Sequence, residues 1–147
     1  CSLILDTGDM ERHNWKLDRK YKEIERKEVR YEEYMIDDAD IVVIAYGTTA
    51  RIAKGAINMV RADGIKAGLI RPITVWPFPK AILQDLAERV RQFVVFEMST
   101  GQMLEDVQLA LAGQGEIAFH GRPGGAIPTP NEFATFIYRQ HRNRKAI

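Results

Sequence analysis

The feature that most constrains this chain is a run of apolar, mostly β-branched side chains at residues 41–46 (IVVIAY). A continuous run without polar alternation is typical of a strand buried on both faces of a sheet. It is far shorter than the ~20 apolar residues of a membrane helix. Similar runs follow at residues 66–71 (KAGLIR), 93–97 (FVVFE) and 116–119 (EIAF). The chain is therefore expected to fold around a central sheet.

The segments between these runs have the spacing of amphipathic helices. Helices are expected over residues 50–62, 80–91, 102–111 and 131–142. Residues 72–79 contain three prolines, and residues 121–130 are rich in glycine and proline, so both are expected to be irregular. Alternating strands and helices indicate parallel pairing, and right-handed crossovers then give a three-layer α/β/α Rossmann-like sandwich.

The N-terminal part of the chain differs in character. Residues 11–28 place Trp15, Leu17, Tyr21 and Ile24 roughly on one stripe of a highly charged helix. So thin an apolar stripe predicts a linker, or an arm lying on a neighbour, rather than a core helix. Residues 29–36 alternate weakly and are expected to form an edge strand. We therefore divide the chain into a charged linker helix and edge strand, residues 1–36, and an α/β domain, residues 37–147.

Charge and cysteine content exclude several classes of function. Lys and Arg number 21 and Asp and Glu 20, and this net charge of +1 gives no reason to expect nucleic acid or a membrane as partner. The single cysteine permits no internal disulfide, and with three histidines it argues against a zinc cluster. A reducing, cytoplasmic setting fits best. Because the chain begins at Cys1 and not at Met, it is expected to be a piece of a longer one.

The balance of charge is uneven along the chain. Residues 41–84 hold six basic side chains and one acidic side chain. Two interpretations are open. These residues are either solvated faces, or a surface that meets an anion, which is a phosphorylated ligand or an acidic partner.

The ends of the predicted strands carry the residues that suit a ligand, because parallel sheets bind ligands at that edge. Gly47, Thr48 and Thr49 lead into a helix whose first turns carry Arg51 and Lys54. Free N–H groups and the helix dipole make this an anion site in principle. The alternative is that Thr48 or Thr49 is only an N-cap. Neither a dinucleotide nor a P-loop fingerprint is present.

Two further strand ends allow more than one role. Arg71 either contacts a carboxylate or phosphate in bidentate fashion, or forms a salt bridge, for instance with Glu97. Trp76, in a stiff loop between prolines, serves either local packing or docking of another protein surface. Glu97 is followed closely by Gly101 and Gln102, which join it as candidate contacts of a ligand or an interface.

His120 and Arg122 follow the last predicted strand. His120 is either a general base or, more commonly for a lone histidine, a structural residue, and Arg122 lies in a turn suited to a phosphate. None of the candidate residues pairs with another as nucleophile and base or as acid and base, so no catalytic residue is assigned.

Four separated strings carry a family resemblance: DADIVVIAYGTTARIAKGAI, GIKAGLIRPITVWPFP, FVVFEMSTGQMLEDVQLAL and FHGRPGGAIPTPNEF. In this order they resemble the C-terminal region of the alpha subunit of 2-oxoacid:ferredoxin oxidoreductases, especially the 2-oxoisovalerate and 2-oxoglutarate types. The upstream HNWKLDRKYKEIERKEVRYEEY resembles the linker of the 2-oxoisovalerate type. The resemblance covers about residues 11–138. It implies a transketolase C-terminal-like domain over residues 37–147, with a mixed sheet in which residues 29–36 form the antiparallel strand.

The resemblance also implies a reaction for an intact complex. A branched-chain 2-oxoacid is oxidatively decarboxylated on thiamine diphosphate, electrons pass through iron–sulfur clusters to ferredoxin, and coenzyme A takes the acyl group. It implies that thiamine diphosphate, its Mg and the clusters are held by other domains and subunits, because this chain has one cysteine and no GDG motif with a downstream Asn.

The chain is then expected to be an assembly and interface domain that is inactive in isolation. The candidate residues would face neighbouring domains and subunits, and no cofactor is expected on this chain alone. Two alternatives stay open. One is an independent module that binds an anion such as coenzyme A or phosphate. The other is the equivalent domain of a transketolase or a dehydrogenase E1 component, which the RPITVWPFP and EMSTGQM strings disfavour.

Overall fold

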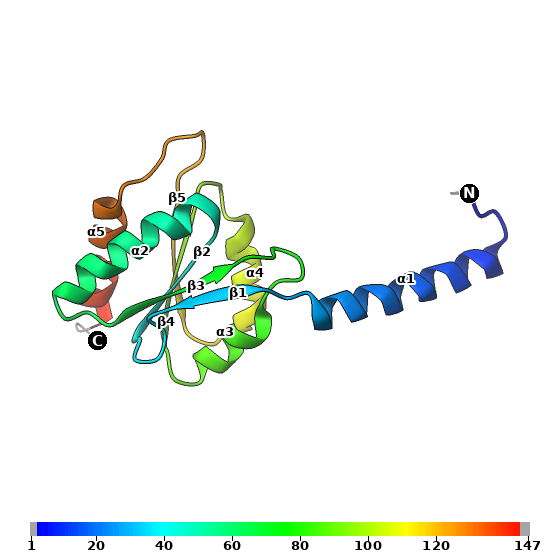
Figure 1. Cartoon of the computed structure of the whole chain (residues 1–147), viewed down its shortest axis with the longest axis horizontal. Coiled ribbons are helices and arrows are strands. Elements are labelled where there is room, and N and C mark those ends of the chain that lie inside the picture. Colours follow the sequence, from blue (N-terminus) through cyan, green and yellow to red (C-terminus); the bar gives the residue numbers. More distant parts are fainter. Residues whose placement is uncertain (1–2, 145–147) are drawn as a thin grey trace.

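The computed structural model describes residues 3–144, which form a five-stranded mixed sheet with helices on both faces (Figure 1). The strands are β1 (Tyr31–Tyr34), β2 (Ile41–Ala45), β3 (Ala67–Pro72), β4 (Gln92–Glu97) and β5 (Glu116–Gly121). The helices are α1 (Thr7–Lys27), α2 (Gly47–Ala62), α3 (Lys80–Ala87), α4 (Gln102–Leu111) and α5 (Pro130–Arg144). Cys1 lies outside the described residues.

The strand order is β1-β3-β2-β4-β5. β1 pairs antiparallel with β3, and the other neighbouring strands pair in parallel. This confirms the predicted α/β/α sandwich and the antiparallel strand within residues 29–36.

The core lies in two layers, one on each face of the sheet. β2 is buried along its whole length, as its continuous apolar run predicts. Its alternate residues Val42 and Ile44 pack in the layer under α3 and α4, whereas Val43 packs in the layer under α2 and α5. In the second layer the rings of Phe96 and Phe133 stack with centroids 3.8 Å apart, which fixes α5 on β4.

Several element ends differ from the predicted ones. α1 begins at Thr7 rather than at residue 11, because the Asp6 carboxylate accepts the Asp9 N–H at 2.8 Å and caps the helix. α2 begins at Gly47, and its N-cap is Tyr46, so the predicted N-cap role of Thr48 or Thr49 is wrong. α3 ends at Ala87 rather than at residue 91.

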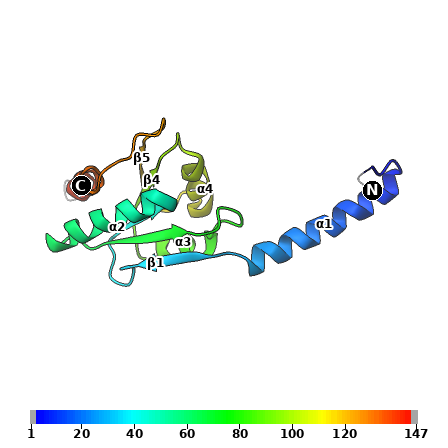
Figure 2. The same cartoon turned by 45° about the horizontal axis from the view of Figure 1, so that its top comes forward.

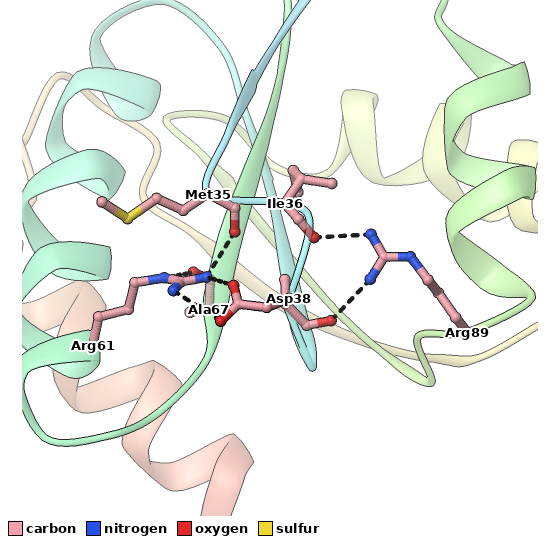
Figure 3. Close-up of polar contacts among 7 residues, drawn as sticks. Met35, Ile36, Asp38, Arg61, Ala67 and Arg89 are labelled. Carbon is pink, nitrogen blue, oxygen red and sulfur yellow. Dashed lines mark hydrogen bonds and ion pairs between the residues drawn. The ribbon is translucent and has the colours of Figure 1, made fainter.

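Two arginines hold the turn between β1 and β2, at the amino-terminal edge of the parallel strands (Figure 3). Arg61 on α2 donates to the carbonyls of Met35 and Ala67, at 2.7 and 2.6 Å, and to the Asp38 carboxylate at 2.6 Å. Arg89 reaches two other carbonyls of the same turn from the opposite face, at 2.8 and 3.4 Å. These contacts tie the turn to α2 on one face of the sheet and to the end of α3 on the other.

α1 stands apart from the sandwich. It has no buried residue, and Figures 1 and 2 show it extending away from the body of the molecule. Among the helices within residues 3–144, none is both long and apolar enough to cross a membrane.

Candidate functional site

The candidate site lies at the carboxyl edge of the parallel strands. β2 leads into α2, which covers one face of the sheet, whereas β4 leads into α4, which covers the other. Because β2 and β4 are neighbours, their two connections diverge from the same point of this edge (Figure 1). Such a point is where open α/β sheets form a crevice for ligands or partner surfaces.

The connection after β2 presents the first turn of α2. Gly47 has φ +55°, in the left-handed region that favours glycine. Thr48 and Arg51 are exposed, whereas Thr49 is buried and its hydroxyl donates to the Tyr46 carbonyl at 2.5 Å. No side chain within the described residues caps this helix, so the N–H groups of its first turn have no side-chain acceptor. Binding of an anion by this turn stays a prediction.

The connection after β4 is organised by Glu97, which is only 1% exposed. Its Oε2 accepts the Met103 N–H at 2.9 Å, so the carboxylate at the end of the strand caps α4. Gly101, with φ +122°, makes the turn between them, and the Gln102 amide bonds to Thr100. Oε1 of Glu97 has no hydrogen-bond partner among the described residues.

Arg71 points to the edge strand rather than to Glu97. Its Nη1 donates to Glu32 Oε2 at 2.9 Å, and Lys54 on α2 forms an ion pair with the other oxygen of Glu32. Hydrogen bonds from Lys54 and then Arg71 hold the pKa of Glu32 below its usual value. Glu32 was not predicted from the sequence, and Lys54, expected beside Arg51 at an anion site, forms an ion pair with Glu32. The signal lay in the antiparallel register, which places Glu32 opposite Arg71.

The connection after β3 carries three exposed apolar side chains at this edge. We call Ile73, Val75 and Trp76 the apolar loop; they are 55%, 58% and 53% exposed. The Trp76–Pro77 peptide is cis. The Tyr21 ring of α1 meets Trp76 edge to face, with centroids 5.9 Å apart. A cavity of about 400 Å³ lies between this loop, the end of α1 and the start of α3.

The connection after β5 is held to α5 by an ion pair and by hydrogen bonds that cap the helix. Arg122 forms an ion pair with Glu132. Glu132 also accepts the Thr129 N–H at 2.6 Å, and the Thr129 hydroxyl accepts the Glu132 N–H at 3.2 Å, which is a capping box. The Thr129 N–H is the main reason that the pKa of Glu132 lies below its usual value. Arg122 therefore has an internal partner, and its role toward a ligand stays a prediction.

His120 lies within β5 among aromatic rings. Its centroid is 6.0 Å from Phe96, 5.7 Å from Phe133 and 5.2 Å from Phe136. Burial there lowers its pKa from the ordinary 6.5. No carboxylate is seen to bond to its ring within the described residues. This arrangement favours the structural interpretation of His120 over that of a general base.

The fold thus places the predicted residues at four neighbouring strand ends. Gly47, Thr48, Thr49 and Arg51 lie at the connection after β2, and Glu97, Gly101 and Gln102 lie at the connection after the adjacent strand β4. Arg71 and Trp76 lie toward β1, and Arg122 lies on the β5 side. Within residues 3–144, no group of three or more His, Cys, Asp or Glu side chains is placed to hold a metal ion.

The comparison that decides the family is a match of residues 39–133 to pyruvate:ferredoxin oxidoreductase core domain II. The chain belongs to this family. This chain is 48% identical, over 126 residues, to the ketoisovalerate oxidoreductase subunit VorB of Methanothermobacter marburgensis. The match covers 86% of this chain and 36% of that subunit.

Two other relatives extend the comparison. VorB of Methanothermobacter thermautotrophicus is 46% identical over 126 residues, covering 86% of this chain and 36% of the relative. The 2-oxoglutarate synthase subunit KorA of Methanothermobacter marburgensis is 41% identical over 101 residues, covering 69% of this chain and 27% of the relative. The chain therefore spans little more than a third of the length of the curated relatives that it matches most extensively.

Solved structures show the same fold. A 2-oxoglutarate:ferredoxin oxidoreductase from Magnetococcus marinus aligns with a TM-score of 0.74 at 19% identity, over 92% of this chain and 24% of its own. A split-gene transketolase, an inactive beta4 tetramer, aligns with a TM-score of 0.62 at 16% identity. The alignment covers 75% of this chain and 40% of the transketolase chain. The expected transketolase-like fold of core domain II is confirmed.

Proposed function

We propose that this chain is the transketolase C-terminal-like domain of the alpha subunit of a 2-oxoacid:ferredoxin oxidoreductase of the branched-chain, 2-oxoisovalerate type. The intact complex would convert the 2-oxoacid to acyl-CoA and pass the electrons to ferredoxin in the cytoplasm. The observation that carries this proposal is the 48% identity to VorB over 126 residues.

In that complex the domain serves assembly. Its carboxyl edge offers an apolar surface, the apolar loop with its adjoining cavity of about 400 Å³, and offers no acid–base couple. Rigid, exposed aromatic and aliphatic side chains are typical anchors of protein interfaces. We infer that the apolar loop and the turns at Gly47 and Glu97 face the other domains and subunits.

The cofactors of such a complex do not fit this chain. An iron–sulfur cluster takes four cysteine thiolates, and the chain has one cysteine. The diphosphate of a thiamine cofactor is held through Mg, and no cluster of carboxylates able to hold a metal ion occurs within residues 3–144. We therefore assign thiamine diphosphate, Mg and the clusters to other domains and subunits, and derive no step through them.

An activity assay tests the proposal. The purified 147-residue chain is mixed with 2-oxoisovalerate, thiamine diphosphate, Mg²⁺, coenzyme A and a dye acceptor, beside a complete ketoisovalerate oxidoreductase as positive control. The isolated chain is expected to reduce no dye. Turnover by the chain alone would contradict the assembly role.

Calorimetry distinguishes this proposal from the alternative that the chain is an independent anion-binding module. Arg51 is exposed on the uncapped first turn of α2, which is the feature that supports such a module. Our proposal predicts no heat when coenzyme A is added to millimolar concentration. Saturable heat that is lost in Arg51→Gln would favour the module instead.

A further inference from the structure

Apart from Tyr21, the apolar stripe of α1 is not covered by another element within residues 3–144. The helix has no buried residue, and no other element lies along it in Figures 1 and 2. Met10 is 39% exposed and Tyr21 49% exposed, and only the C-terminal end of α1 touches the body, through Tyr21 and Trp76. A helix with this face needs a partner surface to bury it.

Trp15 does not share the spacing of Leu17, Tyr21 and Ile24, so its predicted place on the stripe is wrong, and the remaining stripe repeats every seven residues. Met10, Leu17 and Ile24 occupy one position of the repeat, and Thr7, Asn14 and Tyr21 occupy the position that follows it after four residues. These are the d and a positions of a coiled coil, and we call the six residues the α1 seam. Over three heptads an α-helix drifts by only about 20° per heptad, so the seam stays on one face.

The charges beside the seam are sorted by sign. Every e position is acidic, namely Glu11, Asp18 and Glu25, and every g position is basic or a histidine, namely His13, Lys20 and Lys27. In a parallel pair of helices, g residues face the e residues of the next heptad on the partner. Lys20 then meets Glu25 of the second copy, and His13 meets its Asp18. An antiparallel pair would place like charges together.

We propose that α1 pairs with α1 of a second copy of this chain as a parallel, two-stranded coiled coil. The sorted charges favour the parallel orientation, and a polar Asn14 at an a position favours two strands in one register. Neither Lys20 nor Glu25 forms an ion pair within residues 3–144, so both are available to the partner. This inference does not depend on the proposed function.

Sedimentation velocity of the whole chain tests the proposal. A dimer that forms as concentration rises is expected, and Leu17→Lys is expected to abolish it. Trp15→Lys is the matched control, because Trp15 is 56% exposed but lies outside the seam. A chain that stays monomeric up to about 1 mM, or a dimer that survives Leu17→Lys, would overturn the proposal.

Charge exchange tests the orientation. Lys20→Glu places two like-charge contacts across the pair and is expected to weaken the dimer roughly tenfold. Adding Glu25→Lys to the same chain should restore the dimer. Arg19→Glu changes a charge that is neither in the seam nor at an e or g position, so it should leave the dimer unchanged. A dimer that responds equally to Lys20→Glu and Arg19→Glu would contradict the parallel arrangement.

A cross-link tests the register. In a Cys1→Ser background, Asn14→Cys places one thiol at the seam of each helix. Parallel, in-register helices bring the two thiols together, so mild oxidation is expected to give a covalent dimer in high yield. Failure of this variant to cross-link while the chain still dimerises would overturn the proposal.

Discussion

At the scale of single residues, three of the six basic side chains of residues 41–84 bind groups of the chain itself. Lys54 and Arg71 share the Glu32 carboxylate, and Arg61 binds two backbone carbonyls and Asp38. The acids come from residues 31–38, outside the basic stretch. Half of its cations are therefore structural, and Arg51 on the first turn of α2 remains a candidate for an external contact.

The Arg61 contacts predict a cost for a charge-conserving substitution. Arg61→Lys keeps the charge but cannot donate to the Met35 and Ala67 carbonyls at once, because an ammonium lacks the planar fork. We expect the free energy of unfolding to fall by about 1–3 kcal/mol in urea denaturation. Arg51→Lys on the exposed start of the same helix should change it by less than about 0.5 kcal/mol. Equal effects would show that Arg61 does not hold the turn.

The burial of His120 predicts that the free energy of unfolding depends on pH. Burial among Phe96, Phe133 and Phe136 lowers its folded-state pKa below 6.5, so the unfolded chain binds the proton more tightly. The charge of Glu132 opposes this shift and that of Arg122 adds to it. The contribution of His120 to stability is therefore present above pH 6.5 and is lost as the pH falls through the folded-state pKa.

Urea denaturation between about pH 5 and pH 7.5 checks this. The free energy of unfolding should rise with pH in the parent chain, and the rise should be smaller in His120→Gln. An unchanged dependence in His120→Gln would contradict the assignment.

At the scale of elements, the space around two glycines differs: Gly68 in β3 is tightly packed, whereas Gly55 in α2 has room for a methyl group. A Cβ on Gly68 of β3 would lie 2.5 Å from the Met35 carbonyl oxygen and 3.0 Å from the Ala39 Cβ. Gly68→Ala should therefore lower the free energy of unfolding by about 1–3 kcal/mol, because the turn between β1 and β2 must move. Gly55→Ala, inside α2, meets only Pro130 at 3.4 Å and should raise it by up to about 1 kcal/mol. Thermal or urea unfolding of both variants measures the difference, and a tolerated Gly68→Ala would refute the close packing.

The elements themselves were largely predictable, because each buried strand is a continuous apolar run and each core helix has a clear period. Helix starts were less so. Asp6 caps α1 before the apolar stripe begins, and α2 starts directly from the end of β2 without a capping side chain. The partner of Arg71 was missed because Glu32 reaches it through an antiparallel edge strand, a pairing that spacing along the chain does not reveal. The division between residues 36 and 37 stays a prediction, and β1 is hydrogen-bonded to β3 within the sheet.

At the scale of the whole molecule, this chain carries one sandwich, one projecting helix and an apolar edge. The exposure of the apolar loop predicts that it forms an interface. Substitutions in this loop should impair assembly of the complex without impairing folding of the domain. In the isolated chain, Ile73→Ser with Trp76→Ser should leave the free energy of unfolding nearly unchanged, because both side chains are more than half exposed. In a complete oxidoreductase the same change should lower the yield of assembled complex in size-exclusion chromatography. Leu109→Ser, at a side chain 68% exposed on α4, is the control and should leave assembly intact.

We propose that this chain is an interchangeable domain of a branched-chain 2-oxoacid:ferredoxin oxidoreductase. A chimera tests it most directly. The stretch of Methanothermobacter marburgensis VorB that aligns over 126 residues is replaced by that of this chain, and the subunits of the complex are produced together. We predict that the chimeric complex assembles and oxidises 2-oxoisovalerate with coenzyme A as acceptor of the acyl group. A chimera that assembles normally but has no activity with 2-oxoisovalerate, or that fails to assemble although the isolated domain is folded, would contradict the account.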